Sequence, residues 1–309
     1  MIDRHEYALS CDSQCNADFG DTVGNLSIVA KIKSLAILTG LLLSAGPGMA
    51  ADQFSDDAVA SAFPEARWGV TVGGFAGFAP AYEGSDEYRF VGYPLIIPKY
   101  YGDNYDALEA SRVTFKGIDD VRITALRFGQ LDLGPVVGYS FGRDEDDADL
   151  LTGLGDIDGG FNVGGFAALR LAPFYVDAAY VTQITGDTDL GHTIRIGAGW
   201  EDEITERLTG RAYLSTVYAS DDYMDAHFSI SPAQAAASVA GLPVFDAESG
   251  FKNVSLEIGG EYKLTERWSV NSKLGYSRLL SDASDSPVTA SKNQFSGGLG
   301  LTYTFGRTR

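Results

Sequence analysis

The chain has 309 residues, and its 42 Asp and Glu residues outnumber its 23 Lys and Arg residues, so the formal charge is −19. This balance excludes nucleic-acid binding driven by a basic surface. With only 2 Cys and 3 His, the chain also lacks the residues for a site built on several thiolate or imidazole ligands, and we expect no cofactor. Gly (37), Phe (17) and Tyr (16) are abundant instead, and this abundance indicates the type of fold rather than a catalytic site.

The longest apolar run lies at 34–45, after Lys31 and Lys33 and before a small-x-small sequence that ends at Ala50. This order predicts a secretory signal peptide that is cleaved after Ala50. About a dozen apolar residues are too few for a helix across the roughly 30 Å hydrocarbon layer. In chain order we expect an over-extended start over 1–30, the signal peptide over 31–50, a periplasmic N-terminal segment over 51–67, the folded domain over 68–305 and a C-terminal extension over 306–309.

From Trp68 onward the hydropathy pattern has a period of two, as in β-strands with two unlike faces. In 294–305 the odd positions are mostly aromatic or aliphatic, while the even positions are Gly, Ser, Thr and Gln. Aromatic residues recur at the ends of the apolar faces, as they do in the interfacial girdles of outer-membrane barrels. The expected girdle residues are Trp68, Trp200, Tyr262, Trp268, Tyr303 and Phe305.

These segments predict an all-β fold, a transmembrane antiparallel up-and-down β-barrel of about 12 strands over 68–305. The alternative is a periplasmic β-sandwich, whose second face would be a dry core rather than one rich in Gly, Ser, Thr and charges. The connections alternate in length, so the long ones are expected outside the cell and the short ones in the periplasm. In the fourth segment the apolar parity changes sides, which predicts a bulge. The expected strands are 68–78, 88–101, 106–116, 121–129, 132–142, 160–171, 173–185, 191–201, 207–219, 252–263, 268–280 and 294–305.

Charged residues recur on the parity that faces the barrel interior. In a barrel they either line a water-filled path or pair into a closed network that plugs the lumen. We expect a narrow path or a plugged lumen, because about twelve strands enclose more space than a side-chain-filled eight-strand barrel and less than a sixteen-strand porin. The candidates are Asp132, Arg170, Asp177, Arg195, Arg211, Glu257, Glu261, Lys263 and Lys273.

The expected external loop at 143–158 is strongly acidic, and oxygen-rich loops suit Ca²⁺ or Mg²⁺. Its spacing departs from the calcium-loop template, because Ala148 and Asp149 stand where an Asp or Asn and then a Gly are needed. A solvated loop, or one that meets lipopolysaccharide through divalent ions, is the favoured interpretation. The divalent-ion candidates are Asp144, Asp146, Asp147 and Asp149.

The longest expected loop, 220–251, contains the signature of a short helix. Ser231 fits the N-cap, Pro232 the first helical position, Gln234 the reciprocal cap partner and Gly241 the C-terminal stop. Such a helix either orders a long loop or folds over the barrel mouth as a plug or ligand lid.

Catalysis has little support in the sequence. Beyond the signal peptide only His192 and His227 remain, and His227 shares its loop with Asp221, Asp222 and Asp225. A His beside an Asp can act as a general base, but a solvated His in a polar loop is the commoner case. No nucleophile can be assigned near His192. We therefore expect that the protein is not an enzyme.

Short motifs are spread from the first expected strand to the last. They are Pro80-Ala81-Tyr82-Glu83-Gly84-Ser85-Asp86, Leu133-Gly134-Pro135, Gly155-Asp156-Ile157-Asp158-Gly159, Gly241-Leu242-Pro243, Tyr262-Lys263-Leu264-Thr265-Glu266-Arg267-Trp268, Gly275-Tyr276-Ser277-Arg278-Leu279-Leu280 and Tyr303-Thr304-Phe305. As a set they resemble the MipA/OmpV family of outer-membrane proteins, the family of MltA-interacting proteins. One departure is that residues 306–309 follow Phe305, whereas the terminal aromatic of such barrels usually ends the chain.

The resemblance implies an integral barrel in the outer membrane of a Gram-negative cell. It implies contact with outer-membrane lipid and lipopolysaccharide, assembly by the barrel-assembly machinery, and no nucleic-acid partner. The expected function is an envelope scaffold or structural protein linked to a lytic transglycosylase and a murein synthase, with 51–67 as an accessible partner segment. The alternative is a narrow, cation-preferring channel for small solutes or antibiotics. No catalytic residues come with the resemblance.

Overall fold

The computed structural model describes residues 68–100 and 113–305. The expectations for 1–67, for most of the third strand and for 306–309 lie outside the described residues, as does the side chain of Trp68.

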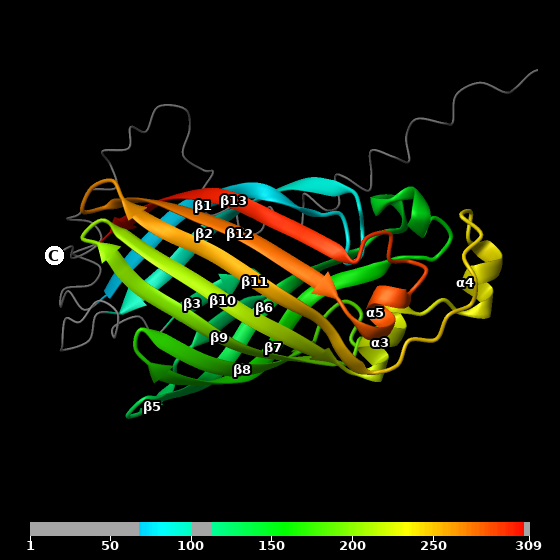
Figure 1. The fold of residues 1–309 in the computed structure, drawn as a ribbon, viewed down its shortest axis with the longest axis horizontal. Coiled ribbons are helices and arrows are strands. Elements are labelled where there is room, and N and C mark those ends of the chain that lie inside the picture. Colours follow the sequence, from blue (N-terminus) through cyan, green and yellow to red (C-terminus); the bar gives the residue numbers. More distant parts are fainter. Residues whose placement is uncertain (1–67, 101–112, 306–309) are drawn as a thin grey trace, which may run out of the picture. The chain divides into compact units, whose positions relative to one another are not determined.

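The described chain forms one antiparallel sheet that is rolled into a nearly closed barrel of 12 strands (Figure 1). Strands that follow one another in the chain pair with each other, and the last strand returns to the first, where Thr304 pairs with Thr71. Among the described residues no ladder joins β2 to β3, which is the one interruption of the ring. The strands are β1 (Trp68–Pro80), β2 (Tyr88–Tyr100), β3 (Val113–Gly117), β4 (Asp120–Ile123), β5 (Leu126–Phe128), β6 (Leu131–Arg143), β7 (Ile157–Leu171), β8 (Phe174–Gln183), β9 (His192–Thr205), β10 (Leu208–Ala219), β11 (Gly250–Lys263), β12 (Trp268–Leu279) and β13 (Asn293–Phe305).

The fourth crossing is divided into β4 and β5, and both parts pair with β6. Arg122 lies opposite Val136 and Leu126 opposite Leu133, so four steps on one strand face three on the other. The extra residue is a bulge, which confirms the bulge that the change of parity predicts in this segment.

Apolar and polar side chains alternate along each strand because one face of the strand contacts lipid and the other faces the barrel interior. On β13 the outward side chains Phe295, Leu299 and Leu301 are about half exposed or more, as expected for side chains that face lipid. The inward Gln294 and Thr302 are buried and hydrogen-bonded to neighbouring strands and loops. Shifting this strand by one residue would put amide and hydroxyl groups into lipid, so the pattern also fixes the register.

The two ends of the barrel differ. At the turn end, the connections are short, such as residues 206–207 and 264–267. On the side of the loop end the connections are longer, except for the short β3–β4 hairpin, and they carry α3 (Asp221–Phe228), α4 (Pro232–Ala237), α5 (Ser281–Asp285) and two 3₁₀ helices, η2 (Glu145–Asp147) and η3 (Asp149–Leu151). None of the helices in the described residues is long and apolar enough to span a membrane.

The loop helix predicted after Ser231 is present as α4, with the reciprocal cap between Ser231 and Gln234. It ends at Ala237, earlier than the predicted stop at Gly241. α4 has no buried residue and lies away from the barrel, whereas the unpredicted α3 lies at the mouth (Figure 1). The loop helix that covers the barrel is therefore α3.

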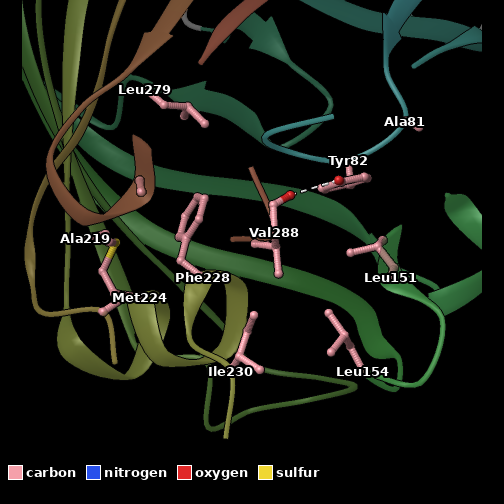
Figure 2. Close-up of a cluster of buried hydrophobic side chains, with 12 residues drawn as sticks. Ala81, Tyr82, Leu151, Leu154, Ala219, Met224, Phe228, Ile230, Leu279 and Val288 are labelled. Carbon is pink, nitrogen blue, oxygen red and sulfur yellow. Dashed lines mark hydrogen bonds between the residues drawn. The ribbon is translucent and has the colours of Figure 1, made fainter. Parts of the chain in front are cut away.

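The largest hydrophobic cluster lies at the loop end rather than inside the barrel (Figure 2). We call it the cap. Phe228, the last residue of α3, and Ile230, just after the helix, are fully buried. They pack against Leu151 from η3 and Val288 from the loop after α5. Tyr82 joins the cap and donates a hydrogen bond of 2.9 Å to the carbonyl of Val288. The members of the cap are Ala81, Tyr82, Leu151, Leu154, Ala219, Met224, Phe228, Ile230, Ala247, Leu279, Ala283 and Val288.

Candidate functional site in the barrel interior

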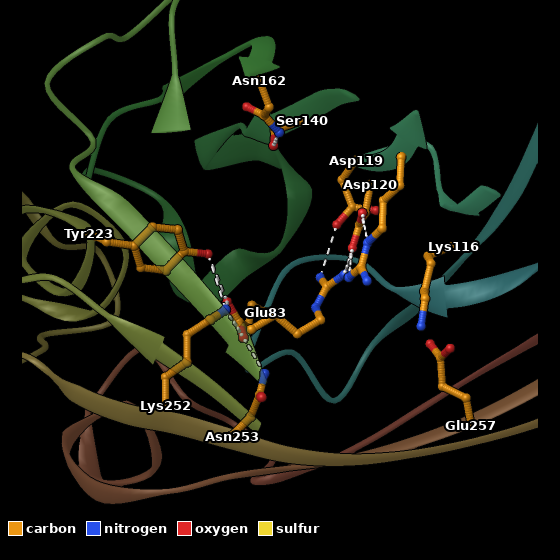
Figure 3. Close-up of polar contacts among 12 residues, drawn as sticks. Glu83, Lys116, Asp119, Asp120, Ser140, Asn162, Tyr223, Lys252, Asn253 and Glu257 are labelled. Atoms are coloured by element: carbon orange, nitrogen blue, oxygen red, sulfur yellow. Dashed lines mark hydrogen bonds and ion pairs between the residues drawn. The ribbon is translucent and has the colours of Figure 1, made fainter. Parts of the chain in front are cut away.

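A network of ion pairs crosses the middle of the barrel. Arg122 is held by both oxygens of Asp120, at 2.8 and 2.9 Å, and its third nitrogen lies 2.9 Å from Asp177 on β8. Lys116 reaches the same Asp177 from β3 at 3.0 Å, and Arg195 on β9 donates to Asp120. Because these strands lie on different sides of the barrel, the contacts run through its interior, and Figure 3 shows the part of them around Asp119 and Asp120. We call this the central network, and its members are Lys116, Asp119, Asp120, Arg122, Asp177 and Arg195.

Two tyrosines complete the central network, and two glycines make room for them. The Tyr213 hydroxyl donates to Asp177 at 2.7 Å, and the Lys116 ammonium lies 3.5 Å from the centre of the Tyr213 ring. A Cβ at Gly197 would stand 2.2 Å from the Tyr213 hydroxyl oxygen, and one at Gly199 would stand 2.1 Å from the neighbouring Tyr175 ring. The inward glycines of β9 are therefore required by the close approach of these rings.

The nine charges singled out in the sequence fall at several levels. Asp177 and Arg195 belong to the central network. Glu257 pairs with Lys273 at 2.8 Å, and Lys273 also donates to the Lys116 carbonyl at 3.2 Å, which links this pair to the network.

The other five of these charges lie nearer the turn end. Asp132 forms ion pairs with Arg127 at 2.6 Å and with Arg170 at 3.2 Å. Arg211 and Glu261 are 4.0 Å apart, and both are partly exposed. Lys263 lies 3.8 Å from Glu203, with both side chains about half exposed. Asp132 is itself buried, but the other charges at this end are partly exposed, whereas Asp120, Arg122 and Asp177 are almost completely buried.

Sequence reasoning missed four members of the central network. Asp119 and Asp120 fall in the expected connection at 117–120, and Lys116 and Arg122 were not singled out on their strands. One signal was available, because Asp120 and Arg122 alternate with Val121 and Ile123. Applied to β4, the period of two assigns Arg122 to the interior.

A second polar cluster lies between the central network and the cap. Lys252 is 2.6 Å from both carboxylate oxygens of Glu83, and the Tyr223 hydroxyl donates to Glu83 at 3.2 Å (Figure 3). His227 stacks on Tyr223 with ring centres 4.1 Å apart, and its Nδ1 lies 3.0 Å from the Tyr223 carbonyl oxygen. We call Glu83, Tyr223, His227 and Lys252 the Glu83 cluster. These residues come from the first loop, α3 and β11.

The Pro80–Asp86 motif accounts for the position of Glu83. Gly84 has a φ of +105°, and a Cβ there would stand 2.9 Å from the Thr289 hydroxyl, so glycine is required. The turn holds Tyr82 in the cap while Glu83 reaches Lys252. Lys252 itself is the extra residue of a bulge, because Val217 pairs with Asn253 and Tyr218 with Phe251. Lys252 and Asn253 are consequently both buried.

Ionisation in the Glu83 cluster follows from burial and from Lys252. Burial alone would raise the pKa of Glu83, but the charge and hydrogen bond of Lys252 lower it below its ordinary value. Burial and the Glu83 charge raise the pKa of Tyr223 to about 12. Burial, with help from the Lys252 and Arg143 charges, lowers the pKa of His227 to about 4. Near neutral pH, Glu83 and Lys252 therefore form a salt bridge. His227 is neutral at this pH, so its imidazole is not in the protonated form that acts as a general acid.

A cavity of about 510 Å³ separates the cap from the central network. Its walls include the Glu83 cluster on one side and Asp119, Asp120 and Arg195 on the other. Within the described residues, the two clusters and the cap lie across the route between the barrel ends.

The acidic loop is organised by hydrogen bonds. Asp147 accepts a hydrogen bond of 3.1 Å from the Asp144 amide and lies 3.4 Å from Arg89, while Asp149 begins η3. Asp146 lies in η2 between Glu145 and Asp147. Across residues 68–100 and 113–305, no group of three or more His, Cys, Asp or Glu side chains is arranged to hold a metal ion.

The expected girdle aromatics fall near the turn end. Trp268 lies against Tyr303 with ring centres 5.0 Å apart, and Tyr303 lies against Phe305 at 4.6 Å. Tyr262, on the neighbouring strand, is exposed, and Trp200 pairs with Phe174 close to another short turn. Aromatic rings at this depth suit the membrane interface.

Comparison with known proteins identifies the family. The model of the family described as MltA-interacting protein MipA matches residues 72–305. Among solved structures, the chain is similar to the COG4313 outer membrane channel from Pseudomonas putida F1, with 12% identity over 77% of this chain and 94% of that one and a TM-score of 0.35. It is also similar to a NanC porin, with 9% identity over 76% of this chain and 98% of that one and a TM-score of 0.37. No curated protein shows a significant match. The chain is an outer-membrane β-barrel protein, and it belongs to the MltA-interacting protein MipA family.

Proposed function

We propose that this barrel is a closed envelope scaffold, or structural protein, that holds murein-synthesising and lytic enzymes at the periplasmic face of the outer membrane. The observation that carries the proposal is the buried central network, whose charges pair with one another instead of lining a water-filled path. The cap closes the loop end above it. A barrel filled in this way suits anchoring better than transport.

The turn end offers a rigid surface for such partners, because short turns of outer-membrane barrels face the periplasm. Two of these turns repeat the sequence Thr-Glu-Arg, at Thr205 and Thr265. In each, the Thr hydroxyl accepts hydrogen bonds from the next amides, at 3.3 and 3.1 Å after Thr205 and at 3.2 and 3.0 Å after Thr265. Glu206 and Glu266 are thereby presented as two equivalent exposed carboxylates. The family description, MltA-interacting protein, suggests a lytic transglycosylase as one partner.

The double variant Glu206→Lys with Glu266→Lys tests this surface. We expect the affinity of the barrel, embedded in lipid vesicles, for a purified lytic transglycosylase to fall about tenfold or more. The two introduced lysines would repel the basic surface of the partner that complements Glu206 and Glu266. The matched control reverses two exposed acids at the loop end, Asp246→Lys with Glu248→Lys, and should leave affinity unchanged. Equal losses in both variants, or no binding by the wild type, would contradict the proposed partner.

The second candidate function is a narrow, cation-preferring channel. It is favoured by the cavity beneath the cap and by the water-facing pairs at the turn end, such as Lys263 with Glu203. Passage would require the cap and the central network both to move aside.

A further inference from the structure

The wall of the cavity contains two buried polar atoms that have no hydrogen-bond partner. Arg143 is only 7% exposed; one of its terminal nitrogens donates to the His227 carbonyl at 3.0 Å, while its Nε has no partner. Asn253 is 8% exposed, and its side-chain oxygen has no partner either. Leaving such atoms unpaired costs about 1–3 kcal/mol each, and more for a charged group, so they call for an explanation.

Both side chains belong to one part of the cavity wall. Arg143 bonds to His227, His227 stacks on Tyr223, and Tyr223 donates to Glu83. The Asn253 amide nitrogen lies 3.5 Å from the same Glu83 carboxylate. Arg143 and Asn253 therefore line the same cavity, and their unpaired atoms lie just beneath its surface.

Arg143 also sets the charge of this wall. Lys252 and Glu83 neutralise each other, whereas no carboxylate of the described residues lies within ion-pair distance of Arg143. Asp147 and Asp156 act on the Arg143 charge only from beyond ion-pair distance, so this wall presents a positive charge without a direct partner. A guanidinium with free donors is suited to an oxyanion, which it can hold through two parallel hydrogen bonds.

The cavity extends to the interrupted part of the barrel wall between β2 and β6. The β3–β4 hairpin is short, and among the described residues the hydrogen bond of 2.9 Å from the Tyr139 amide to the Ile118 carbonyl is the last one along that edge of β6. Beyond it, Arg89 at the start of β2 and Phe141 near the end of β6 both line the cavity. Phe141 is 56% exposed and faces outward, so the cavity extends to a part of the barrel wall that also contacts the lipid side.

We propose that this cavity is a binding site for a sugar that carries a phosphate or carboxylate group. The Arg143 guanidinium would hold the oxyanion, and the Asn253 side chain would turn so that its oxygen accepts a hydrogen bond from a sugar hydroxyl. Its volume of about 510 Å³ fits the range of small-ligand pockets, which is about 300–1,000 Å³. The sugar is either a free molecule or the headgroup of an outer-leaflet glycolipid that enters past Phe141. This site is independent of the scaffold function proposed above.

The test is calorimetric titration of the refolded full chain in an uncharged detergent with glucose 1-phosphate, glucuronate and neutral glucose. Lipid-A-containing nanodiscs analysed by native mass spectrometry supply the lipid arm. We expect at least one anionic probe to bind and glucose not to bind. Arg143→Gln should weaken that binding about tenfold or more, and Asn253→Ala should weaken it less, because only the former removes a charge-assisted hydrogen bond.

Arg278→Gln is the matched control, because Arg278 contacts Asn293 on the outer surface. It should bind as the wild type does, and heat-modifiable migration on gels verifies that each variant has folded. Binding of the soluble anions assigns a free sugar, and binding of lipid A alone assigns a glycolipid headgroup. Failure of every anionic probe to bind, or unchanged binding in both folded cavity variants, would overturn the proposal. None of these outcomes depends on a murein enzyme, so the scaffold function is tested separately.

Discussion

Replacing Asp177 by Ala is expected to lower the free energy of unfolding of the barrel by about 3–5 kcal/mol. Asp177 is 5% exposed and is the shared partner of Lys116 at 3.0 Å, Arg122 at 2.9 Å and the Tyr213 hydroxyl at 2.7 Å. Removing it leaves two buried cations facing each other without a carboxylate between them. The central network would change from three acids and three bases to an excess of one positive charge.

Urea unfolding of the barrel in lipid vesicles measures this effect. The control Glu261→Ala removes an acid from the 4.0 Å pair with Arg211 at the turn end, where both side chains are partly exposed. It should cost at most about 1 kcal/mol, because water screens exposed pairs. If the two variants lose similar stability, the central network is not the buried, tightly coupled unit described above.

Replacing Phe228 by Ala is expected to loosen the cap while the barrel stays folded. The ring is fully buried among Met224, Ile230 and Val288, and truncating a buried Phe costs about 3–5 kcal/mol. The Phe228 carbonyl accepts a hydrogen bond from Ser286, so α3 and the loop after α5 are held together at this point. The strand ladders contain no residue of α3, so truncating Phe228 destabilises the cap and not the sheet.

Hydrogen exchange of the vesicle-embedded protein measures how far the cap is loosened in Phe228→Ala. Amides of α3 and of the loop after α5 should exchange at least about a hundredfold faster in Phe228→Ala, with the strand amides unchanged. Val239→Ala is the matched control, because Val239 lies in the same long loop but is 77% exposed. Unchanged exchange in α3, or equal acceleration in the control, would show that Phe228 does not hold the cap.

The barrel itself is predictable because one rule governs most of its strands. Side chains such as Leu299 face lipid and side chains such as Thr302 face the interior, so the period of two is strong wherever no bulge interrupts it. α3 is not predictable in this way. Its sequence is short and acidic, and only Met224 and Phe228 are buried, so the helix is stabilised by the loops that pack on it rather than by its own pattern.

The Glu83 cluster depends on register that sequence does not reveal. Glu83 and Lys252 are separated by 169 residues, and they meet because β11 contains one extra residue opposite β10. Parity alone assigns only one of Lys252 and Asn253 to the interior, whereas the bulge buries both. The central network was partly anticipated through Asp177 and Arg195, and its partners Asp120 and Arg122 were missed because they border a bulged, interrupted strand.

Single-channel recording in a planar bilayer distinguishes a closed barrel interior from an open one. The refolded protein, verified as folded by heat-modifiable gel migration, would be recorded at two salt concentrations under applied voltage. We expect a silent bilayer at both concentrations, because the cap and the central network close the lumen. Reproducible cation-selective steps that grow with salt concentration would contradict it and would favour the channel function instead.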